Sequence, residues 1–155
     1  MYLRPKIYKI TDNFPYDLLL LADETREAID KYLPRSEVYV ARFADNDIFI
    51  GVFCLYRVDV NTVEIKNIAV SEQYQGKGVG GHLLEEACRV ALDKHYKEII
   101  VGTGDAGKRQ IRFYEKNGFT KYAVRKNFFP DNYEKPIYEN GVMLKDMVLL
   151  KKILK

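Results

Sequence analysis

The sequence predicts one α+β domain, a mixed and mostly antiparallel central sheet flanked by helices. The length of 155 residues is that of a single domain with a substantial core, and no linker, repeat or low-complexity segment divides residues 1–155. Short extended segments joined by Asp and Asn turns dominate the first half, which predicts antiparallel strands. A glycine-rich loop and an amphipathic helix follow, so the mode of connection changes in the second half.

The first segments predict an edge strand and a broken helix. Residues 2–10 partly alternate between apolar and polar side chains, and an edge strand tolerates the proline among them. Asp12 and Asn13, placed just before another proline, predict a side-chain cap at the start of a helix. The helix is expected over residues 15–32, in two pieces with a break near Asp23.

The later elements follow from hydrophobic periodicity and turn residues. Strands that are expected to form an antiparallel meander cover residues 37–43, 48–58 and 62–70. Apolar side chains recur every three or four residues over residues 78–95, which predicts a helix with one buried face. Further elements are predicted at residues 98–103 (strand), 108–117 (a helix ended by Gly118), 121–129 (strand) and 143–150 (strand).

Composition and charge exclude several classes of protein. Charged residues make up 30% of the chain and the net charge is only +3, with Lys and Arg scattered, so no nucleic-acid-binding face is predicted. Cys54 and Cys88 lie in apolar segments without a CxxC pair, which predicts reduced core thiols and no metal site. The first residues lack the apolar stretch of a signal peptide, and no apolar run is long enough to cross a membrane. We therefore expect a cytoplasmic protein.

A glycine-rich loop between a predicted strand and the long helix has the features of an anion-binding site. The loop comprises Gln75, Gly76, Lys77, Gly78, Val79, Gly80 and Gly81. Successive glycines let main-chain atoms approach a phosphate closely. The first N–H groups of a helix have no intrahelical acceptor, and the helix dipole adds positive potential at the same point. The alternative is a glycine-rich turn that binds nothing.

Two nucleotide-binding motifs share part of this pattern. A P-loop requires Lys and then Ser or Thr after its last glycine, but His82 follows Gly81, which excludes that motif. The spacing of Gly76, Gly78 and Gly81 matches the dinucleotide pattern G-x-G-x-x-G, and Asp105 lies at a suitable distance. In the dinucleotide fold, however, the first glycine adjoins the strand, and here residues intervene. Too little chain follows for a doubly wound sheet, so the dinucleotide interpretation is disfavoured.

Two motifs in order give the sequence a resemblance to a known family. The stretches NIAVSEQYQGKGVGGHLLEEA and FYEKNGF resemble the GNAT superfamily of acetyltransferases. The superfamily signature Q/R-x-x-G-x-G/A is filled by Gln75, Gly78 and Gly80. The second motif, Y-x-K-x-G-F, is filled by Tyr114, Lys116, Gly118 and Phe119. The resemblance is close over residues 48–122 and looser outside them.

This resemblance implies a GNAT-like fold and an N-acetyltransferase that uses acetyl-coenzyme A (acetyl-CoA), with no metal. Main-chain amides of the loop from Gln75 to Gly81 are then expected to hold the pyrophosphate of the cofactor. The pantetheine arm is expected beside Ile68, Ala69 and Val70, where a bulge splays the strand. An amide near Val70 would polarise the thioester carbonyl, as the donors of an oxyanion hole do.

The resemblance also implies two catalytic residues. Tyr114 matches the tyrosine that usually protonates the departing sulfur, and Glu64 matches a glutamate that acts as base directly or through water. The alternatives are a tyrosine that only packs on the sheet and a solvated strand carboxylate. Many members carry an Asn seven residues before the tyrosine, where this sequence has Gly107. Cofactor contact there must come from the main chain or from Asp105, or be missing.

The acceptor is the open part of this interpretation. Members of the superfamily shape the acceptor site from the first helices and from the loop before the last strand, here residues 15–32 and 128–141. The second segment offers aromatic and acidic side chains that suit a cationic amine: Phe128, Phe129, Asp131, Tyr133, Tyr138 and Glu139. A packed surface loop or a homodimer contact is the alternative.

Several functional alternatives stay open at this level. The acceptor amine belongs either to a small molecule or to a protein. A catalytically silent CoA-binding or scaffold module is the second reading of the same motifs, and a dinucleotide-binding module is a more distant third.

Overall fold

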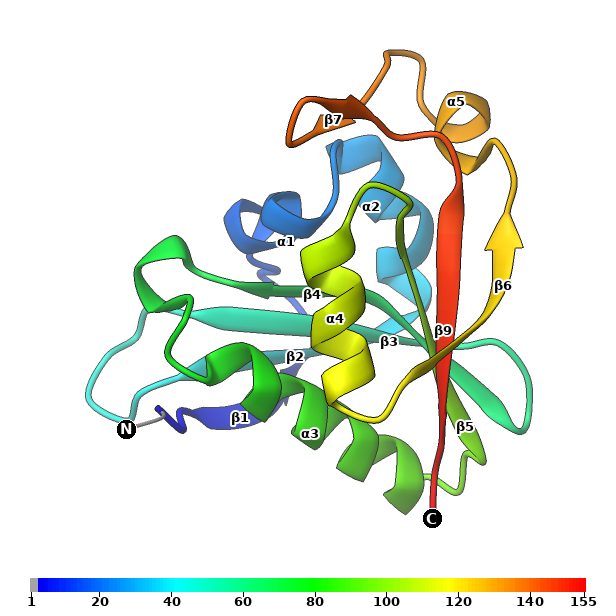
Figure 1. The fold of residues 1–155 in the computed structure, drawn as a ribbon. Helices are drawn as coiled ribbons and strands as arrows, with labels where there is room; N and C mark the ends of the chain where they lie inside the picture. Colours follow the sequence, from blue (N-terminus) through cyan, green and yellow to red (C-terminus); the bar gives the residue numbers. More distant parts are fainter. Residues whose placement is uncertain (1–2) are drawn as a thin grey trace.

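The structure, a computed structural model, describes residues 3–155 and contains a seven-stranded sheet in the order β1-β2-β3-β4-β5-β9-β6 (Figure 1). The strands are β1 (Lys6–Ile10), β2 (Ser36–Arg42), β3 (Gly51–Arg57), β4 (Thr62–Val70), β5 (Glu98–Gly104), β6 (Thr120–Arg125), β7 (Tyr138–Glu139), β8 (Val142–Met143) and β9 (Met147–Ile153). The helices are α1 (Tyr16–Ala22), α2 (Arg26–Tyr32), α3 (Val79–Asp93), α4 (Lys108–Lys116) and α5 (Phe128–Asn132). Only β4 and β5 pair in parallel within the seven-stranded sheet, which confirms the predicted mixed and mostly antiparallel architecture.

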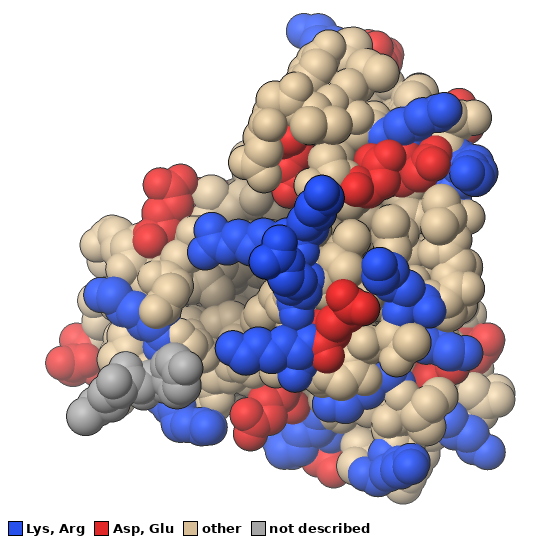
Figure 2. Space-filling view, viewed as in Figure 1, with Lys and Arg blue, Asp and Glu red and all other residues tan. Residues whose placement is uncertain are grey.

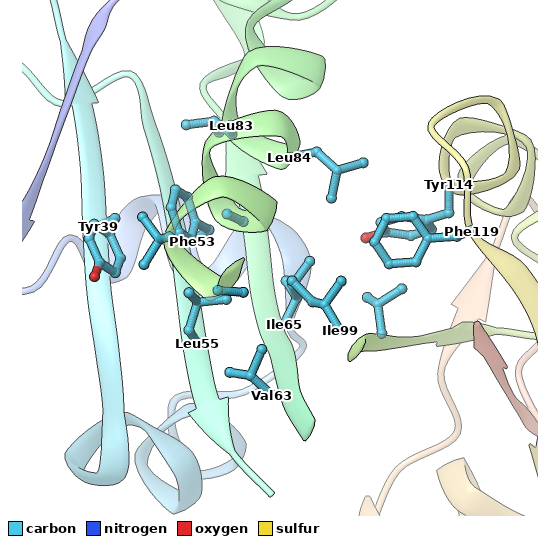
Figure 3. Packing of buried hydrophobic residues seen from close by; sticks show 14 of the residues in the cluster. Tyr39, Phe53, Leu55, Val63, Ile65, Leu83, Leu84, Ile99, Tyr114 and Phe119 are labelled. Carbon is cyan, nitrogen blue, oxygen red and sulfur yellow. The ribbon is translucent and has the colours of Figure 1, made fainter. Parts of the chain in front are cut away.

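Two clusters of buried side chains hold helices against both faces of the sheet. On one face, Leu83 of α3 packs among strand side chains such as Phe53 (Figure 3). On the opposite face, Leu19 of α1 and Ile29 of α2 pack over Val52. Short helices are marginal by themselves, so this burial of one apolar face is what stabilises them.

Most predicted boundaries agree with the structure to within a few residues. The helix expected over residues 15–32 is interrupted at Asp23, and β4 covers the predicted 62–70. Gly118 takes a φ of +92° directly after α4, as a helix-ending glycine should. Residue 2 of the first predicted strand lies outside the described residues, and β1 begins at Lys6.

The side-chain cap predicted for the first helix is wrong. Pro15 occupies the position before α1, and no side chain caps this helix. Asp12 and Asn13 come too early in the chain, because the proline itself stands immediately before the first helical residue. The side-chain cap belongs to α2 instead, where Thr25 Oγ1 accepts a hydrogen bond from the Ala28 N–H at 3.1 Å.

The two C-terminal strands also differ from prediction. The strand expected over residues 121–129 ends at Arg125, because Asn127 turns the chain with a φ of +56° and α5 begins next. The strand expected over 143–150 starts only at Met147. Before it, β7 and β8 form a hairpin turned by Asn140 and Gly141, both with positive φ. An Asn-Gly pair is a strong hairpin signal, so this element was predictable from the sequence.

A β-bulge at Lys66 changes which way the side chains of β4 point. Cys54 of β3 pairs with Asn67 and Leu55 pairs with Ile65, so Lys66 has no counterpart on β3. Before the bulge, Ile65 packs on the α3 face, and after it Ile68 does so again. Asn67 therefore joins Glu64 on the face that α1 and α2 cover.

The sheet opens between β4 and β5. Their parallel pairing joins residues 62–65 to residues 98–101 and then stops, while β4 continues along β3 to Val70 and β5 continues along β9 to Gly104. The bulge expected near Val70 lies four positions earlier, at Lys66, and the separation of the strands starts there. Figure 1 shows α4 lying across this gap.

Three further sequence expectations concern membranes, metals and thiols. None of the helices within residues 3–155 has the length and apolar character needed to span a bilayer. The same residues contain no group of three His, Cys, Asp or Glu side chains arranged to hold a metal ion. Cys54 is buried and Cys88 is half-buried, both are free thiols, and burial raises the pKa of each.

Candidate active site

The glycine loop presents unpaired main-chain donors at the start of α3. Gly76 and Gly78 have φ angles of +75° and +83°, a conformation that other residues rarely adopt. The first helical bond that follows is the one from the His82 N–H to the Gly78 carbonyl, at 3.1 Å. The N–H groups of the three residues between them therefore have no acceptor within the helix. A Cβ atom at Gly76 or Gly81 would meet nothing within 4 Å, so the main chain there is open to a ligand.

Basic side chains gather beside this loop. Figure 2 shows a hollow in the middle of the face with Lys and Arg side chains beside it. These side chains lie where Figure 1 shows α4. Helix α4 carries Lys108, Arg109 and Arg112, all exposed. The hollow thus combines free main-chain donors with positive charge, which is what a phosphate group requires.

Gln75 joins the loop to the end of β4. Its Nε2 donates a hydrogen bond of 2.9 Å to the Val70 carbonyl, and the Lys77 carbonyl accepts a further bond from the Leu3 N–H. Because the Val70 carbonyl bonds to Gln75 and not to β3, the N–H of Val70 also points away from β3, toward the gap. The main-chain groups of the two preceding residues alternate in direction: those of Ala69 face β3, and those of Ile68 face the gap as those of Val70 do.

Tyr114 lies late in α4 with its ring in the core. It is 5% exposed, and its ring contacts those of Phe113 and Phe119 at centroid distances of 5.2 and 5.6 Å. Figure 3 shows its hydroxyl end pointing away from α4, toward Leu84 and Ile65. Burial raises the pKa of Tyr114 above its usual range, so the phenol stays protonated at neutral pH.

A cavity of about 510 Å³ joins the two candidate catalytic residues. Both Tyr114 and Glu64 line it, and so does Ile68 from the gap between β4 and β5. Glu64 is only 6% exposed, and its Oε1 lies 3.3 Å from Lys66 Nζ. A buried carboxylate and a buried phenol thus line one cavity, the arrangement that general acid–base chemistry needs.

Both segments predicted for the acceptor site border the same cavity. Residues 21–24, 28, 31 and 32 line it from α1 and α2. From the second segment, Phe128, Phe129, Tyr133 and Glu139 line it, whereas Asp131 and Tyr138 do not. Tyr138 is instead 63% exposed.

A hydrogen-bonded network around Asp23 ties these segments together. Asp23 accepts hydrogen bonds from the hydroxyls of Tyr133 at 2.6 Å and Tyr32 at 3.1 Å. Tyr32 in turn accepts a bond from Asn67 Nδ2, which also donates to the Leu19 carbonyl. Burial raises the pKa of both tyrosines, which keeps them protonated as donors. The network links α1, α2, β4 and the C-terminal segment across the cavity.

This network is only partly predictable from the sequence. Asp23 and Tyr32 lie in the segment 15–32 that is expected to shape the acceptor site, and Tyr133 is among the predicted acceptor residues, whereas Asn67 is not predicted as a site residue. No spacing in the sequence relates Asp23 to Tyr133, because the two are 110 positions apart.

Close packing accounts for the glycine at position 107, where many members of the superfamily carry Asn. A Cβ atom there would lie 3.1 Å from the Gly104 carbonyl oxygen and 3.3 Å from Thr103 Oγ1, closer than most real contacts. The side chain of Asp105, the other residue expected to contact the cofactor, is turned toward Lys145, whose N–H donates to Asp105 Oδ1 at 3.2 Å. Asparagine is thus disfavoured at position 107, and Asp105 already has a structural partner.

Comparison with known proteins agrees with the fold. The model of the Acetyltransferase (GNAT) family matches residues 5–119. The fold, the site and this match define an acyltransferase. The chain belongs to the Acetyltransferase (GNAT) family, as its two motifs predicted.

Similar proteins cover nearly the whole chain. The uncharacterized N-acetyltransferase YvbK of Bacillus subtilis is 40% identical over 148 residues, which are 96% of this chain and 94% of YvbK. A GNAT family acetyltransferase from Elizabethkingia anophelis, whose crystal structure contains acetyl-CoA, is 46% identical with a TM-score of 0.91, covering 96% of this chain and 97% of that one. The IAA acetyltransferase from Bacillus cereus is 37% identical with a TM-score of 0.91, covering 96% and 99%.

Proposed function

We propose that the protein transfers the acetyl group of acetyl-CoA to a primary amine, with Glu64 as base and Tyr114 as acid. The observation that carries this proposal is the single cavity lined by both side chains, which reaches the gap between β4 and β5 at Ile68. The acetyl-CoA in the Elizabethkingia relative supports the choice of cofactor.

The residues present fit acetyl-CoA at two places. At the start of α3, the free N–H groups after Gly78 suit the pyrophosphate, and the basic side chains of α4 lie beside the hollow. At the gap, the N–H of Val70 suits a carbonyl oxygen. Acetyl-CoA supplies an acetyl group already activated as a thioester.

Three groups of the chain then have separate roles in the transfer. Glu64 removes a proton from the acceptor ammonium, directly or through water, so that the nitrogen gains a free electron pair. The N–H of Val70 donates to the thioester oxygen while negative charge develops on it. The Tyr114 hydroxyl donates its proton to the departing sulfur, a step for which its raised pKa keeps the proton available.

Replacing Tyr114 by Phe is expected to lower kcat by about 10²-fold and to leave acetyl-CoA affinity nearly unchanged. The ring packing is kept and only the hydroxyl is lost. Because burial raises the pKa of Tyr114, its ionisation is not expected to limit the wild-type rate even near pH 10, the ordinary value of a tyrosine. Steady-state kinetics and calorimetry measure the two effects.

The control for this variant is Tyr122→Phe, an exposed residue of the edge strand β6 outside the cavity. It should keep wild-type kcat. A Tyr114→Phe enzyme with wild-type kcat, under conditions in which chemistry limits the rate, would show that this tyrosine serves packing alone and that water supplies the proton.

Thiol release from acetyl-CoA across a panel of amines tests the function as a whole. The panel includes diamines, amino acids, peptides with free N-termini, and IAA, because one relative is described as an IAA acetyltransferase. Amine-dependent release of CoA is expected. Binding of CoA without release for any acceptor would support the catalytically silent module, and binding of NAD in its place would support the dinucleotide module.

A further inference from the structure

One end of the cavity holds carboxylates that have no cationic partner. Asp23, Glu24 and Glu139 line it, and we call these three side chains the acidic end. Over the part of the chain that the structure describes, none of the three forms an ion pair. The fourth carboxylate of the cavity, Glu64, differs in having Lys66 beside it.

The members of the acidic end lie close to one another. Burial, and after it the negative charge of Glu24, raises the pKa of Glu139. Tyr133 lies within the influence of both Asp23 and Glu24, whose charges contribute to its raised pKa after burial. Like charges gathered without a counter-ion are unfavourable, so a cation placed among them would be bound firmly.

The other cations that line the cavity do not fill this role. Lys31 and Arg125 are exposed at its border, and neither makes an ion pair with the acidic end. Arg125 belongs to β6, whose side chains are all exposed.

A second and independent observation comes from Asn67 on the floor of the cavity. The side chain is 3% exposed, and its amide nitrogen donates to Tyr32 and to the Leu19 carbonyl. Its Oδ1 is buried and, among residues 3–155, has no hydrogen-bond partner. A buried carbonyl oxygen without a donor is costly, and the N–H groups of a bound amine are donors of the kind that it lacks.

We infer that the acceptor carries a second positive charge, as diamines and polyamines do, and that the acidic end binds this second ammonium. The inference rests on the proposed function and names its substrate class. The first amine lies near Glu64, where it loses its proton, and Asn67 Oδ1 accepts a hydrogen bond from the bound amine. Aromatic and apolar side chains such as Phe129 and Leu144 also line the cavity and suit a short aliphatic linker.

The test compares two acceptors of equal length on the intact protein. These are 1,4-diaminobutane, with two ammonium groups, and butylamine, with one. Wild type is expected to have a KM at least about tenfold lower for the diamine, which corresponds to one ion pair at roughly 1.4 kcal/mol. Glu139→Gln should remove most of this preference by raising the diamine KM alone, whereas Glu115→Gln, an exposed carboxylate of α4 outside the cavity, should keep it.

A charge-reversed variant is expected to gain activity with a different acceptor, and misfolding would not produce such a gain. Glu139→Lys is expected to disfavour 1,4-diaminobutane and to favour 4-aminobutanoate, whose second group is a carboxylate. Equal KM values for the two acceptors in wild type, or a Glu139→Gln effect of the same size on both, would overturn the inference while thiol release continued. Absence of thiol release with every amine would instead refute the proposed function. In that case titration of 1,4-diaminobutane by calorimetry still decides the subsite: weaker binding to Glu139→Gln supports it, and equal binding overturns it.

Discussion

A Gly78→Asp variant is expected to lose CoA binding by at least about 10³-fold. Gly78 directly precedes the free N–H groups of α3, so a carboxylate there competes with the phosphate for the same donors. Two unit charges 4 Å apart repel by about 4 kcal/mol at the effective dielectric of a protein surface, which alone accounts for a change of this size. Isothermal calorimetry with CoA on the folded variant measures it.

The matched control for this variant is Gly78→Asn. Asn adds a side chain of the same size at the same φ of +83°, a conformation that it tolerates better than most residues, but it carries no charge. It should lose less affinity than Asp, and the difference isolates the electrostatic part. Circular dichroism confirms that both variants are folded. If Gly78→Asp bound CoA like wild type, the pyrophosphate would have to lie elsewhere.

A Glu64→Gln variant is expected to lower kcat/KM by about 10³-fold at neutral pH, within the usual range for removal of a general base. The amide keeps the shape of the side chain but cannot take the proton of the acceptor ammonium. The defect should shrink as the pH rises toward about 10, where an alkylamine loses its proton without help. The pH dependence of kcat/KM therefore separates a lost base from a general loss of structure.

A structural role of Glu64 makes a different prediction. The carboxylate also lies 3.3 Å from Lys66 Nζ, so the variant removes an ion pair as well as a base. Lys66→Met removes the same ion pair and leaves the carboxylate in place. If Lys66→Met reproduced the loss seen in Glu64→Gln, or if that loss were independent of pH, Glu64 would act by holding Lys66 and not by accepting a proton.

The parts of the fold that were predictable from the sequence are those with strong local signals. The stripe of α3, the alternation of β4 and the turn residues between the first strands each depend on neighbouring residues. The two motifs located the glycine loop and Tyr114 for the same reason. Where two local signals competed, the prediction was wrong: the side-chain cap before Pro15 is absent, and the strand boundaries between Arg125 and Met147 differ.

The parts of the site that were not predictable depend on contacts between distant residues. Asp23 and Tyr133 meet only because α1 and the C-terminal segment lie on the same side of the sheet. Asn67 belongs to the cavity only because of the bulge beside it, and a regular strand would have turned this side chain toward α3. The family motifs do not cover these positions, so the acceptor site needed the structure.

The extra residue in β4 also constrains how this strand is able to change in evolution or in engineering. The bulge shifts the alternation of side chains along β4 by one residue. Before Lys66 the even-numbered residues face α1 and α2, and after it the odd-numbered residues do so. Deletion of Lys66, the residue without a counterpart on β3, would leave a regular strand with Asn67 and Ile68 on their present faces. Deletion of a residue away from the bulge would instead turn the side chains beyond it to the opposite faces, unless the bulge compensated. Diversity in acceptor choice is thus expected from side-chain replacement along this strand, and tolerated changes of its length should be confined to the bulge.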